Sequence, residues 1–111
     1  ARRGPRERPA VLRVGSLTLD PGTRRVTRGD TAIELSTKEF QLLEAFMRAP
    51  GLVLTRTQLL DRAWEHDYEN RSNVVDVYVS ALRRKLDRES ERELIHTIKG
   101  VGYRLGVMDP V

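Results

Sequence analysis

The stretch SNVVDVYVSALRRKL, residues 72–86, carries two separate apolar patterns on what its spacing predicts to be one helix. At about 100° per residue, one stripe has the composition of a core-facing helix surface. This stripe consists of Val75, Val79, Leu82 and Leu86. Val77 falls almost opposite the stripe, between Asn73 and Arg84. An outward valine set between an amide and a guanidinium group indicates a second partner besides the core.

The outward face carries the side-chain types that read DNA bases. Amides bond adenine, guanidinium groups bond guanine, and small apolar groups contact the thymine methyl. The face supplies each type with little bulk at its centre: Asn73, Val77, Ser80, Ala81 and Arg84, flanked by Val74 and Tyr78. An alternative is a solvated helix with one exposed valine, since isolated surface apolar residues are common. The helix alone leaves both interpretations open.

Two further helices are expected upstream, over residues 36–51 and 55–64. Each begins with a capping box, in which Ser or Thr precedes Glu or Gln by three positions. The boxes are Ser36 with Glu39 and Thr55 with Gln58. Pro50-Gly51 stops the first helix, and the second ends near Trp64. The polar segment between the second and third helices then predicts a helix-turn-helix with an enlarged turn.

Short alternating stretches predict β-structure at both ends of the chain. Four antiparallel strands are expected over VLRV (11–14), LTL (17–19), RRVTR (24–28) and TAIEL (31–35), whereas LVL (52–54) is expected to be an extended link. The Arg-Gly-Asp triplet at 28–30 predicts a hairpin turn rather than an adhesion motif. The segment 94–107 predicts two strands joined around Gly100-Val101-Gly102. The predicted fold class is therefore α+β: a winged helix-turn-helix with an N-terminal four-stranded antiparallel sheet, three helices and a C-terminal β-hairpin wing.

The predicted hairpin presents cations near its tip. Lys99 lies at the mouth of the glycine turn, with Arg104 just beyond it. A cation on a narrow hairpin suits a minor groove or a phosphate. The alternative is a surface hairpin whose lysine protects a strand edge. Thr97 and Tyr103 could donate hydroxyl bonds to phosphates, and Tyr103 could equally belong to the core.

Phosphate contacts are also expected from the helices. Trp64 stands where the second helix meets the following loop, and its indole N–H is a donor, although a lone tryptophan is commonly a core residue. Arg56 lies in the first turn of the same helix. Arg83 projects to the side of the third helix, where it could meet a phosphate or simply face water.

Composition limits the function classes. The 111 residues fit one domain, and 20 Lys and Arg against 16 Asp and Glu give a net charge of +4. That balance fits a polyanionic partner without requiring one. The chain has no cysteine, which excludes disulfides and thiolate metal sites and agrees with a reducing cytoplasm. No apolar run approaches a membrane span, and no signal-peptide pattern is present.

The sequence contains no motif that indicates an enzyme. A nucleophile motif, a phosphate-binding glycine loop and metal-ligand spacing are all missing from the sequence. The acidic residues of the loop EHDYEN (65–70) fit a solvated or protein-facing loop better than a cation site. Asp76, flanked by valines, is expected to form a structural ion pair or cap. We therefore expect neither catalysis nor a cofactor or metal.

Four blocks of sequence together resemble the OmpR/PhoB-type winged-helix effector domain, the DNA-binding output module of bacterial two-component response regulators. The blocks are LSTKEFQLLEAF (35–46), LTRTQLLDRAW (54–64), VDVYVSALRRKL (75–86) and IHTIKGVGYRL (95–105). The resemblance covers residues 11–107, which leaves 1–10 as an interdomain linker and 108–111 as a C-terminal tail.

The resemblance implies a role for each candidate residue. The third helix, about residues 70–87, enters the major groove, and the wing, residues 95–105, reaches the minor groove or the backbone. The base-facing residues are Asn73, Val74, Val77, Tyr78 and Ala81. The backbone-facing residues are Arg56, Trp64, Arg83, Arg84, Thr97 and Tyr103. The wing residues are Lys99, at a position where the family often has arginine, and Arg104. The loop residues Glu65, His66, Asp67, Tyr68 and Glu69 are a candidate contact for RNA polymerase.

The resemblance also implies partners and location. Members bind double-stranded DNA at sites made of tandem direct repeats. An N-terminal receiver domain and a cognate sensor kinase are also expected. The isolated domain is expected to be monomeric off DNA, without membrane association, in the bacterial cytoplasm. A second hypothesis is a winged helix that binds protein, because fold does not fix function. The salt dependence of DNA binding separates the two.

Overall fold

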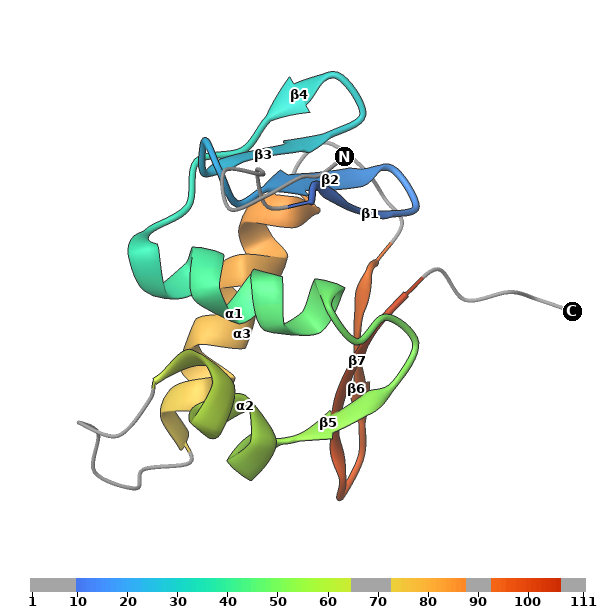
Figure 1. Ribbon diagram of the computed structural model, residues 1–111. Coiled ribbons are helices and arrows are strands. Elements are labelled where there is room, and N and C mark those ends of the chain that lie inside the picture. The colour runs from blue at the N-terminus through green and yellow to red at the C-terminus, as the bar shows by residue number, and fades with distance from the viewer. Residues whose placement is uncertain (1–9, 65–72, 88–92, 107–111) are drawn as a thin grey trace, which may run out of the picture.

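The computed structural model describes residues 10–64, 73–87 and 93–106 (Figure 1). In chain order the elements are β1 (Leu12–Val14), β2 (Leu17–Asp20), β3 (Arg25–Arg28), β4 (Thr31–Ala32), α1 (Thr37–Met47), β5 (Val53–Thr55), α2 (Arg56–Ala63), α3 (Asn73–Leu86), β6 (Ile95–Ile98) and β7 (Gly102–Leu105). One sheet caps the helices at the top of Figure 1, and the other stands beside them at the right. The predicted α+β winged-helix fold is confirmed.

The N-terminal sheet is an antiparallel meander in the order β1-β2-β3-β4. Leu17 and Leu19 alternate with polar neighbours along β2 and are fully buried, so one face of the sheet closes the core. The fourth strand is shorter than predicted and covers only Thr31–Ala32. After a last backbone bond from Ile33 to Val26 O, the chain leaves the sheet for the cap of α1.

The second sheet contains a strand that the sequence did not predict. The stretch expected to be an extended link contributes β5, which pairs antiparallel with β7 to give the order β5-β7-β6. Leu54 lies opposite Tyr103, and Val53 opposite Arg104. A strand of three residues has little periodicity of its own, because it is stabilised by a partner distant in sequence. The wing is therefore a three-stranded sheet rather than a free hairpin.

Both predicted capping boxes are present. Ser36 Oγ accepts the Glu39 N–H at 3.2 Å, and Glu39 Oε1 accepts the Ser36 N–H at 2.9 Å. The box at the start of α2 has the same form, with distances of 3.1 Å and 2.9 Å between Thr55 and Gln58. The caps expected for α3, Asn70 or Ser72, lie outside the described residues.

The core is built around α1, which contacts α2 and α3. The predicted core stripe of α3 is confirmed: Val75, Val79, Leu82 and Leu86 are at most 2% exposed. Burying each such side chain contributes roughly 1.5–3 kcal/mol of hydrophobic free energy.

The described helices include none long and apolar enough to cross a lipid bilayer.

The C-terminal end of α3 is fixed by the N-terminal sheet. Arg28 of β3 is 9% exposed and donates from Nη1 to Leu86 O at 2.7 Å and to Asp87 Oδ1 at 2.9 Å. A cation at a helix C-terminus also interacts favourably with the helix dipole. The sheet therefore sets the position of α3 from behind, and leaves its outer face open.

Candidate nucleic-acid interface

The outer face of α3 is a solvent-exposed surface directly opposite the buried stripe. Val77 is 61% exposed at its centre, and Asn73, Ser80 and Arg84 are also exposed. Val74, Tyr78 and Ala81 are half-buried at the borders of this face. One face of this helix is thus buried and the opposite face exposed, as predicted from residues 72–86, within the described part of that stretch.

The border of this face is supported by Trp64. The Trp64 and Tyr78 rings lie edge to face, with centroids 5.4 Å apart and planes at 67°. Trp64 is 6% exposed and belongs to the hydrophobic core. Lys38 donates to Ala63 O at 3.0 Å and places its ammonium 5.4 Å from the Trp64 ring centroid. Trp64 is therefore packed as a core residue. A contact between Trp64 and DNA stays a prediction.

Arg56, Asp76 and Tyr103 form a junction of α2, α3 and β7. Arg56 Nε lies 3.0 Å from Asp76 Oδ1 and 3.3 Å from Oδ2, so the ion pair expected for Asp76 is present. The Tyr103 hydroxyl donates to Asp76 Oδ1. Burial, and then the bond to Asp76, raise the pKa of Tyr103, so the phenol keeps its proton at neutral pH. The bond to Asp76 likewise raises the pKa of Arg56.

Arg83 joins α3 to the wing. Its Nε donates to Ile95 O at 3.1 Å, and its Nη2 donates to the Thr97 hydroxyl at 2.6 Å. The sequence predicted that both Arg83 and Thr97 face phosphates, and the structure shows that they also bond each other. Because Thr97 Oγ1 accepts from Arg83, its own hydroxyl hydrogen is directed elsewhere.

The wing turn presents Lys99 and Val101. Gly100 adopts a positive φ of 77° between them, and Val101 N–H donates to Ile98 O at 2.9 Å. Lys99 is exposed, and Val101 is 48% exposed. Arg104 lies further along β7, half-buried opposite His96. The two predicted wing cations therefore lie at different distances from the turn. Val101 was not among the predicted site residues, although an apolar residue between two turn glycines is a visible signal in the sequence.

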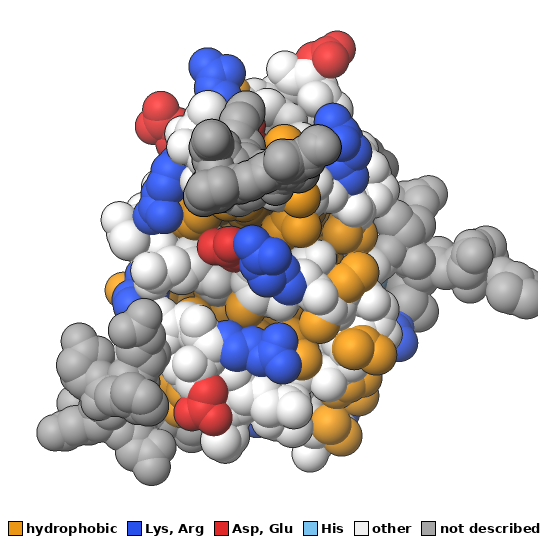
Figure 2. Space-filling model, viewed as in Figure 1, with side chains coloured by type: hydrophobic (Ala, Val, Ile, Leu, Met, Phe, Trp, Pro, Cys, Tyr) orange, Lys and Arg blue, Asp and Glu red, His pale blue; other side chains and the backbone are white. Residues whose placement is uncertain are grey.

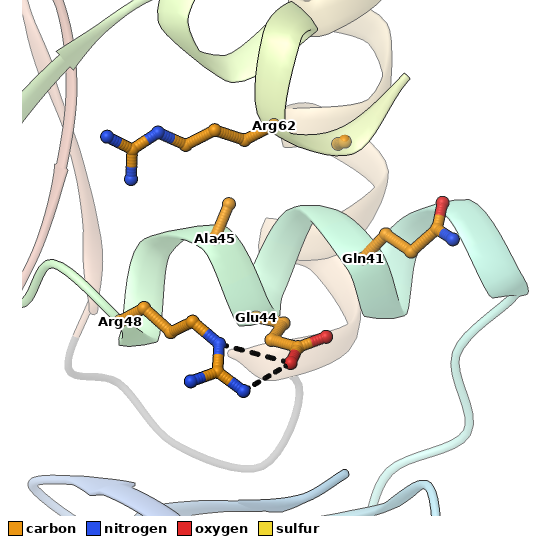
Figure 3. A pocket seen from close by; sticks show the side chains of 6 residues that line it. Gln41, Glu44, Ala45, Arg48 and Arg62 are labelled. Carbon is orange, nitrogen blue, oxygen red and sulfur yellow. Dashed lines mark hydrogen bonds and ion pairs between the residues drawn. The ribbon is translucent and has the colours of Figure 1, made fainter. Parts of the chain in front are cut away.

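A groove of about 450 Å³ lies between α1 and α2 (Figure 3). It is lined by Gln41, Glu44, Ala45, Arg48, Arg62 and Ala63. Arg48 donates to Glu44 Oε2 from Nε at 3.2 Å and from Nη2 at 2.7 Å, across one turn of α1. The described residues contain no group of three or more His, Cys, Asp or Glu side chains placed to hold a metal.

The face of the molecule in Figure 2 carries mixed charges. Basic, acidic and apolar side chains are interspersed over the helices rather than gathered by sign. Apolar side chains gather along the right-hand edge, where Figure 1 places the second sheet. The exposed large hydrophobic residues include Leu52, Val53 and Val101, which belong to β5, its approach and the wing turn. Among the described residues on this face, the basic side chains are not gathered into one continuous surface.

The family model described as "Transcriptional regulatory protein, C terminal" matches residues 30–105. The chain belongs to this family. It is of the OmpR/PhoB type, as the sequence blocks indicated. The family is one of transcriptional regulators, not of enzymes.

Curated relatives agree with this assignment. The transcriptional regulatory protein TcrA of Mycobacterium tuberculosis is 56% identical over 105 residues, which cover 95% of this chain and 42% of TcrA. The response regulator MprA of Mycolicibacterium vanbaalenii is 46% identical over 101 residues, covering 91% of this chain and 44% of MprA. The chain thus spans less than half the length of these relatives.

Solved structures of the same fold include two DNA complexes. The RstA DNA-binding domain of Klebsiella pneumoniae, in complex with the RstA box, is 33% identical with a TM-score of 0.73, covering 86% of this chain and 96% of that one. The AdeR DNA-binding domain, in complex with an intercistronic region, is 26% identical with a TM-score of 0.76, covering 84% and 96%. The fold of this family member is therefore that of response-regulator DNA-binding domains.

Proposed function

We propose that this domain binds double-stranded DNA sequence-specifically and regulates transcription as the output domain of a two-component response regulator. The observation that carries the proposal is the exposed outer face of α3, with Val77 61% exposed opposite a fully buried stripe. The RstA and AdeR complexes support it, because those domains of the same fold bind DNA.

The outer face of α3 would lie in the major groove, which admits an α-helix. Asn73 is placed to bond an adenine, and Val77 to contact a thymine methyl at the centre of the helix. Ala81 continues this face with little bulk, and Val74 and Tyr78 lie at its borders. The helix is held rigidly by its core stripe and by Arg28, so these side chains meet the groove without reorganising the backbone.

Backbone contacts would come from residues around this face. Arg84 is exposed on α3. Arg56, Arg83 and Thr97 lie around the junction of α2, α3 and the wing, and Trp64 packs behind the border of this face. Tyr103 is buried and donates its hydroxyl to Asp76, so its contribution would be indirect, through that bond. Lys99 would enter the adjacent minor groove from the wing turn, and Arg104 would approach the backbone from β7. Lysine acts there as a point charge, without the flat stacking surface of arginine.

The remaining partners follow the resemblance. We propose tandem direct repeats as the binding site, a receiver domain preceding the linker at residues 1–10, and a cognate sensor kinase, in the bacterial cytoplasm. The domain alone would be monomeric off DNA. The candidate polymerase contact at Glu65, His66, Asp67, Tyr68 and Glu69 lies outside the described residues, as do most of the linker and the tail at 108–111.

A salt titration of DNA binding tests this function. Fluorescence anisotropy of a labelled duplex would be measured at increasing salt concentration. Binding should weaken steeply, with a log–log slope of about −0.9 for each phosphate neutralised. A winged helix that binds protein would give no such dependence, and an isotherm that does not change with salt would contradict the proposal.

A further inference from the structure

Asp76 is an acidic residue in a surface proposed to approach phosphates. It lies in the first turn of α3, and its side chain is 41% exposed. A carboxylate near the DNA backbone repels phosphates, so its net electrostatic effect on binding should be unfavourable. If Asp76 favours DNA binding, it must therefore do so through its contacts with other side chains rather than through its own charge.

Its contacts link three elements of the proposed interface. Asp76 accepts from Arg56 of α2 and from Tyr103 of β7, and is itself part of α3. The guanidinium carbons of Arg56 and Arg83 lie 5.8 Å and 5.7 Å from the Tyr103 ring centroid. Arg83 then bonds Thr97 on β6. One carboxylate thus stands at the centre of the contacts among α2, α3 and the wing.

The geometry of the ion pair leaves Arg56 able to bind a second anion. Asp76 accepts from Nε of Arg56, and the Arg56 side chain, which also interacts with Tyr103, remains 40% exposed to solvent. A guanidinium group held at one edge keeps its other donors in a fixed direction. Fixing this long side chain before binding also removes part of the entropy that ordering it would cost.

We propose that Asp76 is a positioning residue for DNA binding. Its carboxylate orients Arg56 toward a phosphate. Through its bond with the Tyr103 hydroxyl, it also holds the wing in a fixed position relative to α3. This inference rests on the proposed function, and deepens it by assigning a role to a residue that does not itself touch DNA.

The decisive variant is Asp76→Asn, because repulsion and positioning predict opposite signs. If Asp76 acted only through its charge, neutralising it would tighten DNA binding. The positioning role predicts weaker binding, by about tenfold, the scale of one lost charged hydrogen bond. Asp61→Asn is the matched control: Asp61 is exposed on α2, and within the described residues it has no ion-pair partner. Its neutralisation should leave affinity unchanged or slightly raise it.

Tyr103→Phe tests the link to the wing. The ring that Arg56 and Arg83 contact is kept, and only the hydroxyl is lost. Affinity should fall several-fold for a duplex that spans the wing contact, and stay unchanged for a duplex shortened at its wing-side end. A variant that merely destabilised the fold would lose affinity for both duplexes equally. Thermal unfolding confirms that each variant is folded at the assay temperature.

The outcomes separate this inference from the function beneath it. Wild-type protein that fails to bind duplex DNA would overturn the proposed function. If wild-type protein binds, Asp76→Asn binding as tightly or more tightly would overturn the positioning role alone. Equal losses of Tyr103→Phe on the two duplexes would overturn the wing link.

Discussion

Lys85 on α3 places its ammonium nitrogen 2.7 Å from Glu39 Oε1 on α1. The same carboxylate oxygen closes the capping box by accepting the Ser36 N–H. Glu39 is 6% exposed, and burial by itself would raise its pKa. The bonds from Lys85 and Ser36 outweigh burial, so the pKa of Glu39 lies below its ordinary value of 4.5. One buried carboxylate therefore ties the start of α1 to the last turn of α3.

This pair predicts a loss of stability in acid. Because the folded pKa of Glu39 is lowered, its contribution is complete above the ordinary value of 4.5 and is lost as pH falls through the lower folded value. We expect Glu39→Gln to reduce the free energy of unfolding at neutral pH by about 1–2 kcal/mol. In acid the difference from wild type should shrink, and urea unfolding at about pH 7 and about pH 3 measures it.

The control is Glu44→Gln. Glu44 forms an ion pair with Arg48, whose side chain is 51% exposed, so solvent screens the pair. This change should alter stability little at either pH. An unchanged difference between Glu39→Gln and wild type across the two pH values would contradict the linkage.

Replacing Val77 or Asn73 with alanine should relax sequence preference. Each side chain is proposed to contact a base edge, and a wrong base pair typically costs roughly 1–3 kcal/mol. The penalty for changing the matching base pair should therefore shrink in the variant, while binding to unrelated duplexes stays the same. Competition assays with single-base-pair changes measure this. Undiminished discrimination in both variants would show that the face of α3 is wrongly assigned.

Arg84→Ala should weaken binding to all duplexes about equally. Arg84 is exposed on the last turn of α3, and a phosphate contact carries no sequence information. The salt slope should become shallower by about 0.9, the value for one phosphate. Arg62→Ala, which removes the same charge at the groove between α1 and α2, should leave the slope unchanged. A loss confined to one base pair would instead place Arg84 on a base.

Gly102→Ala should destabilise the wing. A Cβ at Gly102 would lie 2.1 Å from Leu54 O, so β5 and β7 would have to separate. We expect a destabilisation of about 1–3 kcal/mol, the scale of overpacking in a tight site. Gly106→Ala is the control, because its Cβ would meet only ordinary contacts at 3.8 Å. Thermal unfolding compares the two, and equal melting temperatures would contradict the close approach of the two strands.

The helices could be predicted from the sequence because their signals are local. Ser36 with Glu39 and Thr55 with Gln58 marked two helix starts, and the period of Val75, Val79, Leu82 and Leu86 marked the buried side of the third. The three residues of β5 could not be predicted in the same way. Their pairing with β7 depends on a partner distant in sequence, and three residues carry too little alternation to show it.

The candidate site was predictable in its exposure but not in its connections. The spacing of α3 correctly placed Val77 outward. Spacing within one element cannot show that Arg83 reaches Thr97, or that Tyr103 reaches Asp76, since these bonds join separate elements. The position of Trp64 in the sequence is compatible with a core residue and with a surface contact, and only the tertiary packing shows it buried.

Selection of wild-type domain on a pool of random DNA duplexes tests the central proposal most directly. Sequencing the bound fraction should reveal one recurrent motif, enriched over the starting pool and repeated in tandem. Enrichment of such a motif is the result predicted for a domain that reads bases with the outer face of α3. A bound fraction with the same base composition as the starting pool would contradict sequence-specific binding.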